Sequence, residues 1–133
     1  MTSEGSLGVS GRRLLIVEDE YLIAWDLASW LESKGAEVIG PMPSVVDALA
    51  VLKVEPLPDA AVLDINLGDE QVFPVADALR AAHVPFVFLS GYDGKIIPEH
   101  LATAPCCIKP LNRPRLLDAL ARLCTAAAPD SGS

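Results

Sequence analysis

The stretch LLIVEDE, residues 14–20, consists of four apolar residues followed by three acids. An apolar run without polar alternation is typical of a strand buried on both faces, as in a parallel sheet covered by helices. Similar runs recur at steps of 21–24 residues, and the later ones begin near residues 37, 60, 84 and 105. That step is the length of one strand and one helix, so the spacing predicts five successive strand–helix units.

Helical patterns fill the intervals between these strands. The apolar residues of 20–34, Ile23 and Leu27 among them, recur with helical spacing. In the segment 91–103, Gly94 and Pro98 interrupt any long helix, so a short or mobile helix is expected there. We predict an α/β fold, a flavodoxin-like doubly wound five-stranded parallel sheet of order 2-1-3-4-5 with helices on both faces. The predicted strands are 14–17, 37–40, 60–64, 86–89 and 104–108, and the other helices span 72–82 and follow Ser44 and Asn112.

The composition is that of one folded domain. Of the 133 residues, 51% are apolar and 21% are charged, which suits a single hydrophobic core over 12–125 with flexible segments at 1–11 and 126–133. A net charge of −8 disfavours nucleic-acid binding. Without a secretion signal or an apolar run of about 18 residues, we expect a cytoplasmic protein that does not contact membranes. The cysteines are expected to be reduced and buried: Cys106, Cys107 and Cys124.

Polar residues follow four of the five predicted strands. The first strand leads into Glu18 and Asp19, the third ends in Asp64, the fourth in Ser90, and the fifth in Lys109. Ligands of such sheets bind at the carboxyl ends of the strands. We therefore expect three carboxylates, a hydroxyl and an ammonium group to meet at one edge.

Crowded carboxylates need positive charge before they can all ionise. Lys109 supplies one charge, and oxygen ligands of this kind suit Mg²⁺. The backbone carbonyl of Asn66, two residues past Asp64, offers another oxygen. With a metal ion bound, Asp64 can act as a nucleophile on phosphorus, and the Lys109 ammonium and Ser90 hydroxyl can stabilise the phosphoryl oxygens.

Four short motifs resemble the receiver domain of two-component response regulators: LLIVEDE (14–20), AVLDINL (61–67), FLSGY (88–92) and IKP (108–110). The resemblance implies that Asp64 is the phosphoacceptor and that Asp19 binds Mg²⁺ directly, with Glu18 acting through water. It also implies that Ser90 is the family's conserved hydroxyl residue, and that Lys109 contacts the phosphoryl group and precedes a cis proline.

The stretch PFVFLSGYD (85–93) is similar to the PFxFxTGY pattern of the FAT GUY single-domain response regulators, with Ser90 in place of threonine. Cys106 stands where most receivers carry a switch aromatic three residues before the lysine. Two alternatives could replace this aromatic as the switch. One is Tyr92, and the other is ordering of the segment 91–103 on phosphorylation.

This resemblance implies a signalling module that takes phosphate from a histidine kinase or a histidine phosphotransfer protein. It would act by binding a downstream protein or as a phosphate sink, and would catalyse only its own phosphorylation and dephosphorylation. An aspartyl-phosphate phosphohydrolase is an alternative, but such enzymes need an acid where Asn66 stands. A degenerate receiver that docks without phosphorylation is a second alternative, which the complete set of acids, hydroxyl and lysine disfavours.

Overall fold

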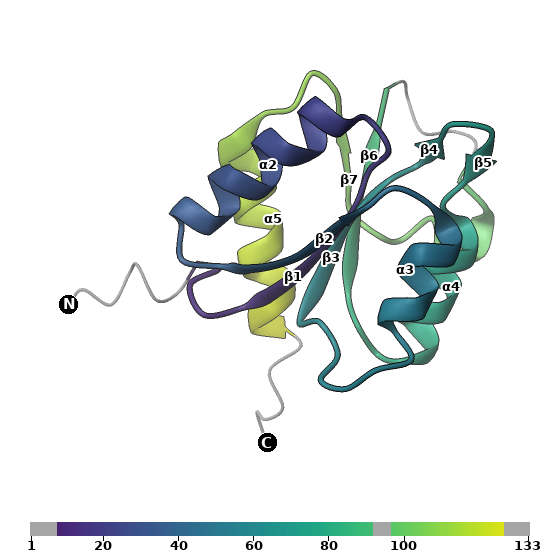
Figure 1. Ribbon diagram of the computed structural model, residues 1–133, viewed down its shortest axis with the longest axis horizontal. Coiled ribbons are helices and arrows are strands. Elements are labelled where there is room, and N and C mark those ends of the chain that lie inside the picture. Colours follow the sequence, from purple (N-terminus) through teal and green to yellow (C-terminus); the bar gives the residue numbers. More distant parts are fainter. Residues whose placement is uncertain (1–7, 92–96, 127–133) are drawn as a thin grey trace.

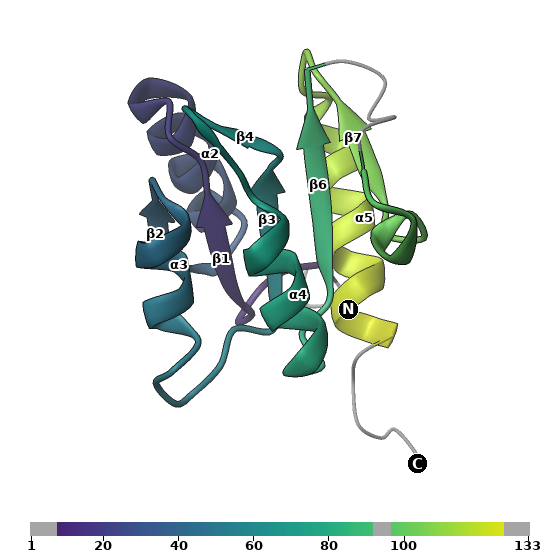
Figure 2. The ribbon, with the colours of Figure 1, turned by 90° about the vertical axis from the view of Figure 1, so that its right-hand side faces the viewer.

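The computed structural model describes residues 8–91 and 97–126, which form a sheet between two layers of helices (Figure 1). Its five strands are all parallel in the order β2-β1-β3-β6-β7, which confirms the predicted order 2-1-3-4-5. Figure 2 shows that their carboxyl ends lie at one edge. The strands are β1 (Arg13–Val17), β2 (Glu37–Met42), β3 (Ala60–Asp64), β6 (Phe86–Ser90) and β7 (Cys106–Ile108).

Helices cover both faces of the sheet (Figure 1). On one side, α2 (Tyr21–Ser33) and α5 (Arg113–Ala126) pack against the strands, and on the other, α3 (Val45–Val51) and α4 (Phe73–Ala81) do so. The strands serve both cores because successive side chains point to opposite faces. Leu14 and Ile16 of β1 therefore join the α2–α5 core, whereas Leu15 and Val17 join the α3–α4 core, with all four fully buried.

The buried face of α2 differs from the predicted one. Its buried residues include Ala24 and Ala28 beside Leu27 and Leu31, whereas Ile23 is 42% exposed. Small alanines let the helix lie close to the sheet, and a pattern read from large apolar residues misses them. Because the alanines and not the larger residues face the sheet, several large apolar side chains are exposed to solvent at the start of the helix: Tyr21, Leu22, Ile23 and Trp25.

A short antiparallel hairpin follows β3 and was not predicted. It consists of β4 (Asn66–Leu67) and β5 (Glu70–Gln71), with Gly68 in the left-handed region at φ +62°. In the described part of the segment 91–103, the helical structure is a single 3₁₀ turn, η1 (Glu99–Leu101), so the predicted helix there is short. Tyr92, Gly94 and the other residues of 92–96 lie outside the described residues.

The predicted start of the folded domain at residue 12 is too late. Val9 is 1% exposed in the α2–α5 core, and the Gly11 amide donates a hydrogen bond to the Gly35 carbonyl at 2.8 Å. Residues 8–11 therefore belong to the fold, whereas 1–7 and 127–133 lie outside the described residues.

The prediction of buried cysteines holds for Cys124 and is wrong for Cys106, which is exposed. Cys107 is half-buried, and all three cysteines are free. The reason is that β7 is a three-residue strand at the edge of the sheet, where one face is not covered. No helix in the described part of the chain is long and apolar enough to cross a bilayer.

Phe88 is a sensitive point of the α3–α4 core. It is fully buried in β6 and makes edge-to-face contacts with Phe73 and Phe86 at 5.8 and 5.3 Å between ring centroids. We expect Phe88→Ala to lower the free energy of unfolding by about 3–5 kcal/mol, since it leaves a cavity in a close-packed core. Urea denaturation measures this. The control Val54→Ala, at a position 64% exposed, is expected to change stability little, and equal effects of the two substitutions would contradict the assignment.

Candidate functional site

Three carboxylates meet at the carboxyl edge of the sheet. Glu18 and Asp19 follow β1, and Asp64 ends β3, which pairs with β1 directly. One carboxylate oxygen from each of the three residues lies within 4.8 Å of the other two. Glu18 and Asp64 are buried, at 2% and 5% exposure, whereas Asp19 is exposed. The structure thus brings together the acids that the sequence placed at strand ends, and their roles stay predictions.

Lys109 supplies the positive charge at this site. Its Nζ lies 2.7 Å from Asp64 Oδ2 and 3.7 Å from Glu18 Oε1. Burial alone would lower the pKa of Lys109, but the hydrogen bond and charge of Asp64, with the charges of Glu18 and Glu20, raise it. Lys109 therefore stays protonated. The Lys109–Pro110 bond is cis, as the resemblance implied, and the Lys109 amide donates to the Ser90 carbonyl at 2.8 Å.

Burial and the neighbouring Asp64 carboxylate raise the pKa of Glu18 from 4.5 to about 8, against the opposing effects of the Glu20 amide and Lys109. The Glu20 amide donates to Glu18 Oε2 at 3.1 Å. The other oxygen, Oε1, is buried and has no hydrogen-bond partner among the described residues. A buried carboxylate oxygen without a hydrogen bond, beside two further carboxylates, is a site where a cation would be favourable.

Ser90 and Asn66 also reach this edge. Ser90 is the last residue of β6 and is buried. The backbone amide of Asn66 donates a hydrogen bond to Asp64 Oδ1 at 3.1 Å, so the β4–β5 hairpin starts in contact with the candidate phosphoacceptor. Asn66 therefore contacts the acidic cluster, and Ser90 ends the strand that pairs with β3.

Gly68 is a residue of the site that sequence reasoning did not single out. A Cβ atom at its position would lie 3.5 Å from Asp19 Oδ2, so the hairpin turn lies against the exposed acid. The stretch Leu67-Gly68-Asp69 carries a turn signal that could have located it, because glycine readily adopts the positive φ found here.

The donor set fits a hard divalent cation. Three carboxylates face one ammonium group, which leaves the site rich in negative charge. Oxygen-only ligands supplied by one or two carboxylates are typical of Mg²⁺ sites, where water and phosphate complete the coordination. Asp19, Asp64 and Glu18 are the residues that could hold such an ion.

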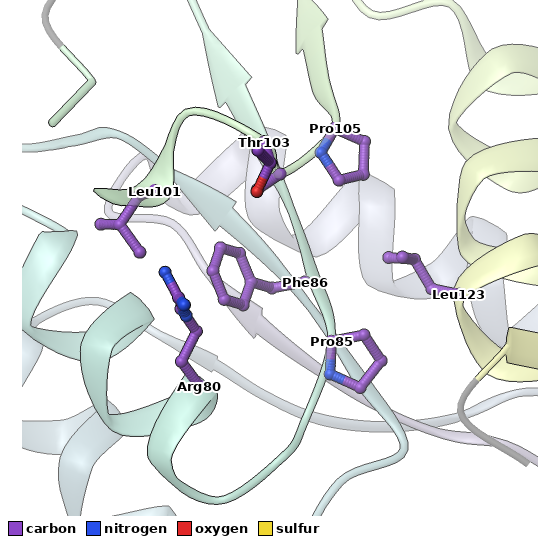
Figure 3. A pocket seen from close by; sticks show the side chains of 8 residues that line it. Arg80, Pro85, Phe86, Leu101, Thr103, Pro105 and Leu123 are labelled. Carbon is purple, nitrogen blue, oxygen red and sulfur yellow. The ribbon is translucent and has the colours of Figure 1, made fainter. Parts of the chain in front are cut away.

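Cavities lined by described residues also lie away from the three acids. Figure 3 shows one of about 250 Å³ at the amino end of β6, with Arg80, Phe86 and Leu101 in its lining. No acidic residue lines it, so it offers no metal site. A larger cavity, of about 490 Å³, lies beside Lys109 between α2 and the start of α5 and is lined in part by Ile23 and Leu111.

The chain is similar to a curated protein of signal transduction. No protein-family model matches the chain. The sensory transduction protein LytT of Bacillus cereus is 33% identical over 112 residues, which are 81% of this chain and 45% of LytT. The chain therefore spans less than half the length of this curated relative.

Solved structures match the fold over most of its length. SdrG from Sphingomonas melonis Fr1 is 38% identical, with a TM-score of 0.73 over 85% of this chain and 96% of SdrG, and it has also been solved in a BeF₃-activated conformation. The response regulator protein TrrA from Thermotoga maritima, in complex with Mg²⁺ and BeF, is 22% identical, with a TM-score of 0.72 over 84% of this chain and 98% of TrrA. Further matches are receiver domains of response regulators.

The raised pKa of Glu18 implies that the free energy of unfolding depends on pH. Between pH 4.5 and about 8 the unfolded chain loses the Glu18 proton more readily than the folded protein does, so this group destabilises the metal-free fold increasingly as the pH rises. We expect Glu18→Gln to raise the free energy of unfolding by roughly 1–3 kcal/mol at pH 8 and by little at pH 5.

Denaturation in a metal chelator at both pH values measures this difference. Glu20→Gln, which removes an exposed acid of the same loop, serves as the control. A stabilisation of Glu18→Gln that is equal at the two pH values would contradict the assigned pKa.

Proposed function

Since this chain belongs to the receiver-domain family of two-component response regulators, we propose that Asp64 accepts a phosphoryl group from a histidine kinase or a histidine phosphotransfer protein. Receiver domains in general are phosphoacceptors that interact with such proteins. The observation that carries the proposal is the contact of 2.7 Å between the buried Asp64 carboxylate and the Lys109 ammonium group, inside a cluster of acids.

In the proposed transfer, an Asp64 carboxylate oxygen attacks the phosphorus atom of a phosphohistidine. The P–N bond breaks, its electron pair stays on the imidazole nitrogen, and the phosphoryl group becomes part of an acyl phosphate on Asp64. The Lys109 ammonium group, which pairs with Asp64 beforehand, then neutralises a phosphoryl oxygen. The Ser90 hydroxyl at the end of β6 donates a hydrogen bond to another oxygen of the group.

Asp19, Asp64 and the Asn66 carbonyl would hold Mg²⁺ directly, and Glu18 would act through water. Receiver domains bind Mg²⁺ at an acidic pocket, and the mutual approach of these carboxylates within 4.8 Å supports the assignment here. When bound, the ion offsets the negative charge that gathers on the transferring oxygens. The chain's own residues position the nucleophile and keep the ammonium group beside it.

The start of α2 supports a role in partner binding. Leu22 and Trp25 are 79% and 58% exposed, and neighbouring Ile23 lines the cavity beside Lys109. An exposed apolar surface next to the phosphoryl site is suited to bind a partner protein that must present its phosphohistidine to Asp64. The phosphorylated domain would then bind a downstream protein or drain phosphate from the kinase. The three free cysteines are in keeping with action in the cytoplasm, which we also propose.

Phosphorylation is tested by mass spectrometry after incubation with acetyl phosphate or a histidine kinase, with and without Mg²⁺. We expect an adduct of about 80 Da that requires Mg²⁺ and is absent from Asp64→Asn. The matched control is Asp69→Asn, an exposed acid of the same loop, which should be phosphorylated normally. Absence of an adduct with every donor would leave a docking domain, and continuous release of phosphate from added phosphate esters would indicate a hydrolase.

Lys109 is tested separately from Asp64. We expect Lys109→Ala to slow adduct formation by about tenfold or more, because the charge that stabilises the phosphoryl oxygens is lost, while circular dichroism shows a folded chain. Lys34→Ala, which removes an exposed lysine at the end of α2, is the matched control. An unchanged rate in Lys109→Ala would argue against the assigned role.

A further inference from the structure

The β4–β5 hairpin connects the acidic cluster to the start of α3. Glu70, in β5, uses Oε2 to accept a hydrogen bond of 3.1 Å from the amide of Val45. Val45 is the first residue of α3, and the amides of a first helical turn lack partners within their own helix. A side chain of the hairpin therefore satisfies a backbone group of another element, 25 residues away along the chain.

The rest of the hairpin lies against the proposed metal site. At one end, the Asn66 amide donates to Asp64 Oδ1 at 3.1 Å, and at the turn, Gly68 lies against Asp19, as the 3.5 Å distance from its hypothetical Cβ to Oδ2 shows. The hairpin thus contacts two of the three acids and carries the carbonyl of Asn66 at its start. Its position decides where that carbonyl lies relative to the carboxylates.

Strands of two residues are too short to fix this position alone. At its base the hairpin is closed by a hydrogen bond of 2.9 Å from the Val72 amide to the Ile65 carbonyl. Two further contacts join it to the α3 side of the sheet, on which it lies in Figure 1. Leu67 is 3% exposed and packs in the same core cluster as Val45, and Glu70 holds the Val45 amide. The first contact is apolar and has no direction, whereas the second fixes one atom against another.

Helix α3 also has a cap of its own, at a different amide. Ser44 is its N-cap, and the Ser44 hydroxyl accepts a hydrogen bond from the Asp47 amide at 3.2 Å. The helix therefore has one cap within its own segment, and the contact made by Glu70 joins its first amide to the hairpin.

We propose that Glu70 is a positioning residue of the metal site: by holding the Val45 amide, it keeps the hairpin of residues 66–71 against Asp19 and Asp64 and so sets the affinity for Mg²⁺. This inference rests on the proposed function, because it assumes that the acidic cluster binds the ion. Glu70 touches neither the ion nor the phosphoryl group in this proposal, and acts through Asn66 and Gly68.

The test is an Mg²⁺ titration of the whole chain followed by NMR of the backbone amides, together with hydrogen exchange of the Asn66 amide in the metal-free protein. We expect Glu70→Ala to weaken Mg²⁺ binding by about three- to tenfold, somewhat less than the loss typical of groups that contact metal ligands directly. We also expect it to speed exchange of the Asn66 amide, since the hairpin loses an anchor. Glu70→Gln keeps an oxygen acceptor and should stay within about twofold of the wild type in both measurements.

Two controls separate positioning from other effects. Asp69→Ala removes a neighbouring exposed charge of the same hairpin, and Ser44→Ala removes the cap of α3 without touching the hairpin. Asp69→Ala should leave affinity and exchange unchanged. Ser44→Ala should lower thermal stability while Mg²⁺ affinity stays near that of the wild type.

The inference is overturned if Glu70→Ala binds Mg²⁺ as the wild type does, or if Glu70→Gln and Asp69→Ala weaken binding equally, which would indicate a general charge effect. It is also overturned if Ser44→Ala reproduces both effects of Glu70→Ala. A wild-type chain that neither binds Mg²⁺ nor forms the phosphoryl adduct would instead refute the proposed function, and with it this inference. A wild type that does both, beside an unchanged Glu70→Ala, refutes the inference alone.

Discussion

Repulsion among Glu18, Asp19 and Asp64 is the constraint that shapes the functional edge of this protein. Three carboxylates whose oxygens approach within 4.8 Å repel one another unless positive charge lies nearby. The Lys109 ammonium group offsets part of that charge through its contact with Asp64, while burial and the Asp64 carboxylate still raise the pKa of Glu18. The remaining demand for positive charge makes the site suitable for a cation and then for a phosphoryl group.

The sheet makes this crowding possible. Its central strands are buried on both faces and are held by two separate cores, so their carboxyl ends are fixed rigidly relative to each other. Asp64 and Ser90 stand at the ends of fully buried strands. The stability of two hydrophobic cores therefore supports a group of charges that would otherwise move apart.

The loops at this edge are held less firmly, and their hydrogen bonds take on the positioning. The backbone amide of Lys109 is hydrogen-bonded to Ser90, and its ammonium group contacts Asp64. The hairpin after β3 rests on a few contacts, to Asp64 at one end and to α3 at the other. Small changes in such loops can alter the affinity for ligands without altering the fold.

Much of this arrangement could be predicted from local patterns. The five strands, their order and the gathering of Glu18, Asp19, Asp64, Ser90 and Lys109 follow from apolar runs, regular spacing and the rule that parallel strands end at one edge. Features that depend on packing between distant segments could not be predicted. One example is the orientation of α2, which buries Ala24 and exposes Ile23. Another is the exposure of Cys106 on a short edge strand.

The sequence by itself therefore determined which chemical groups stand at the ends of the strands, because residue type and period are local properties. Only the tertiary structure decided how strongly those groups interact. The burial of Glu18 Oε1 without a hydrogen bond depends on the packing of distant segments. The 2.7 Å contact of Lys109 with Asp64 and the attachment of Glu70 to α3 join residues 25 or more positions apart. Such contacts depend on how the helices and strands pack, which no local pattern contains.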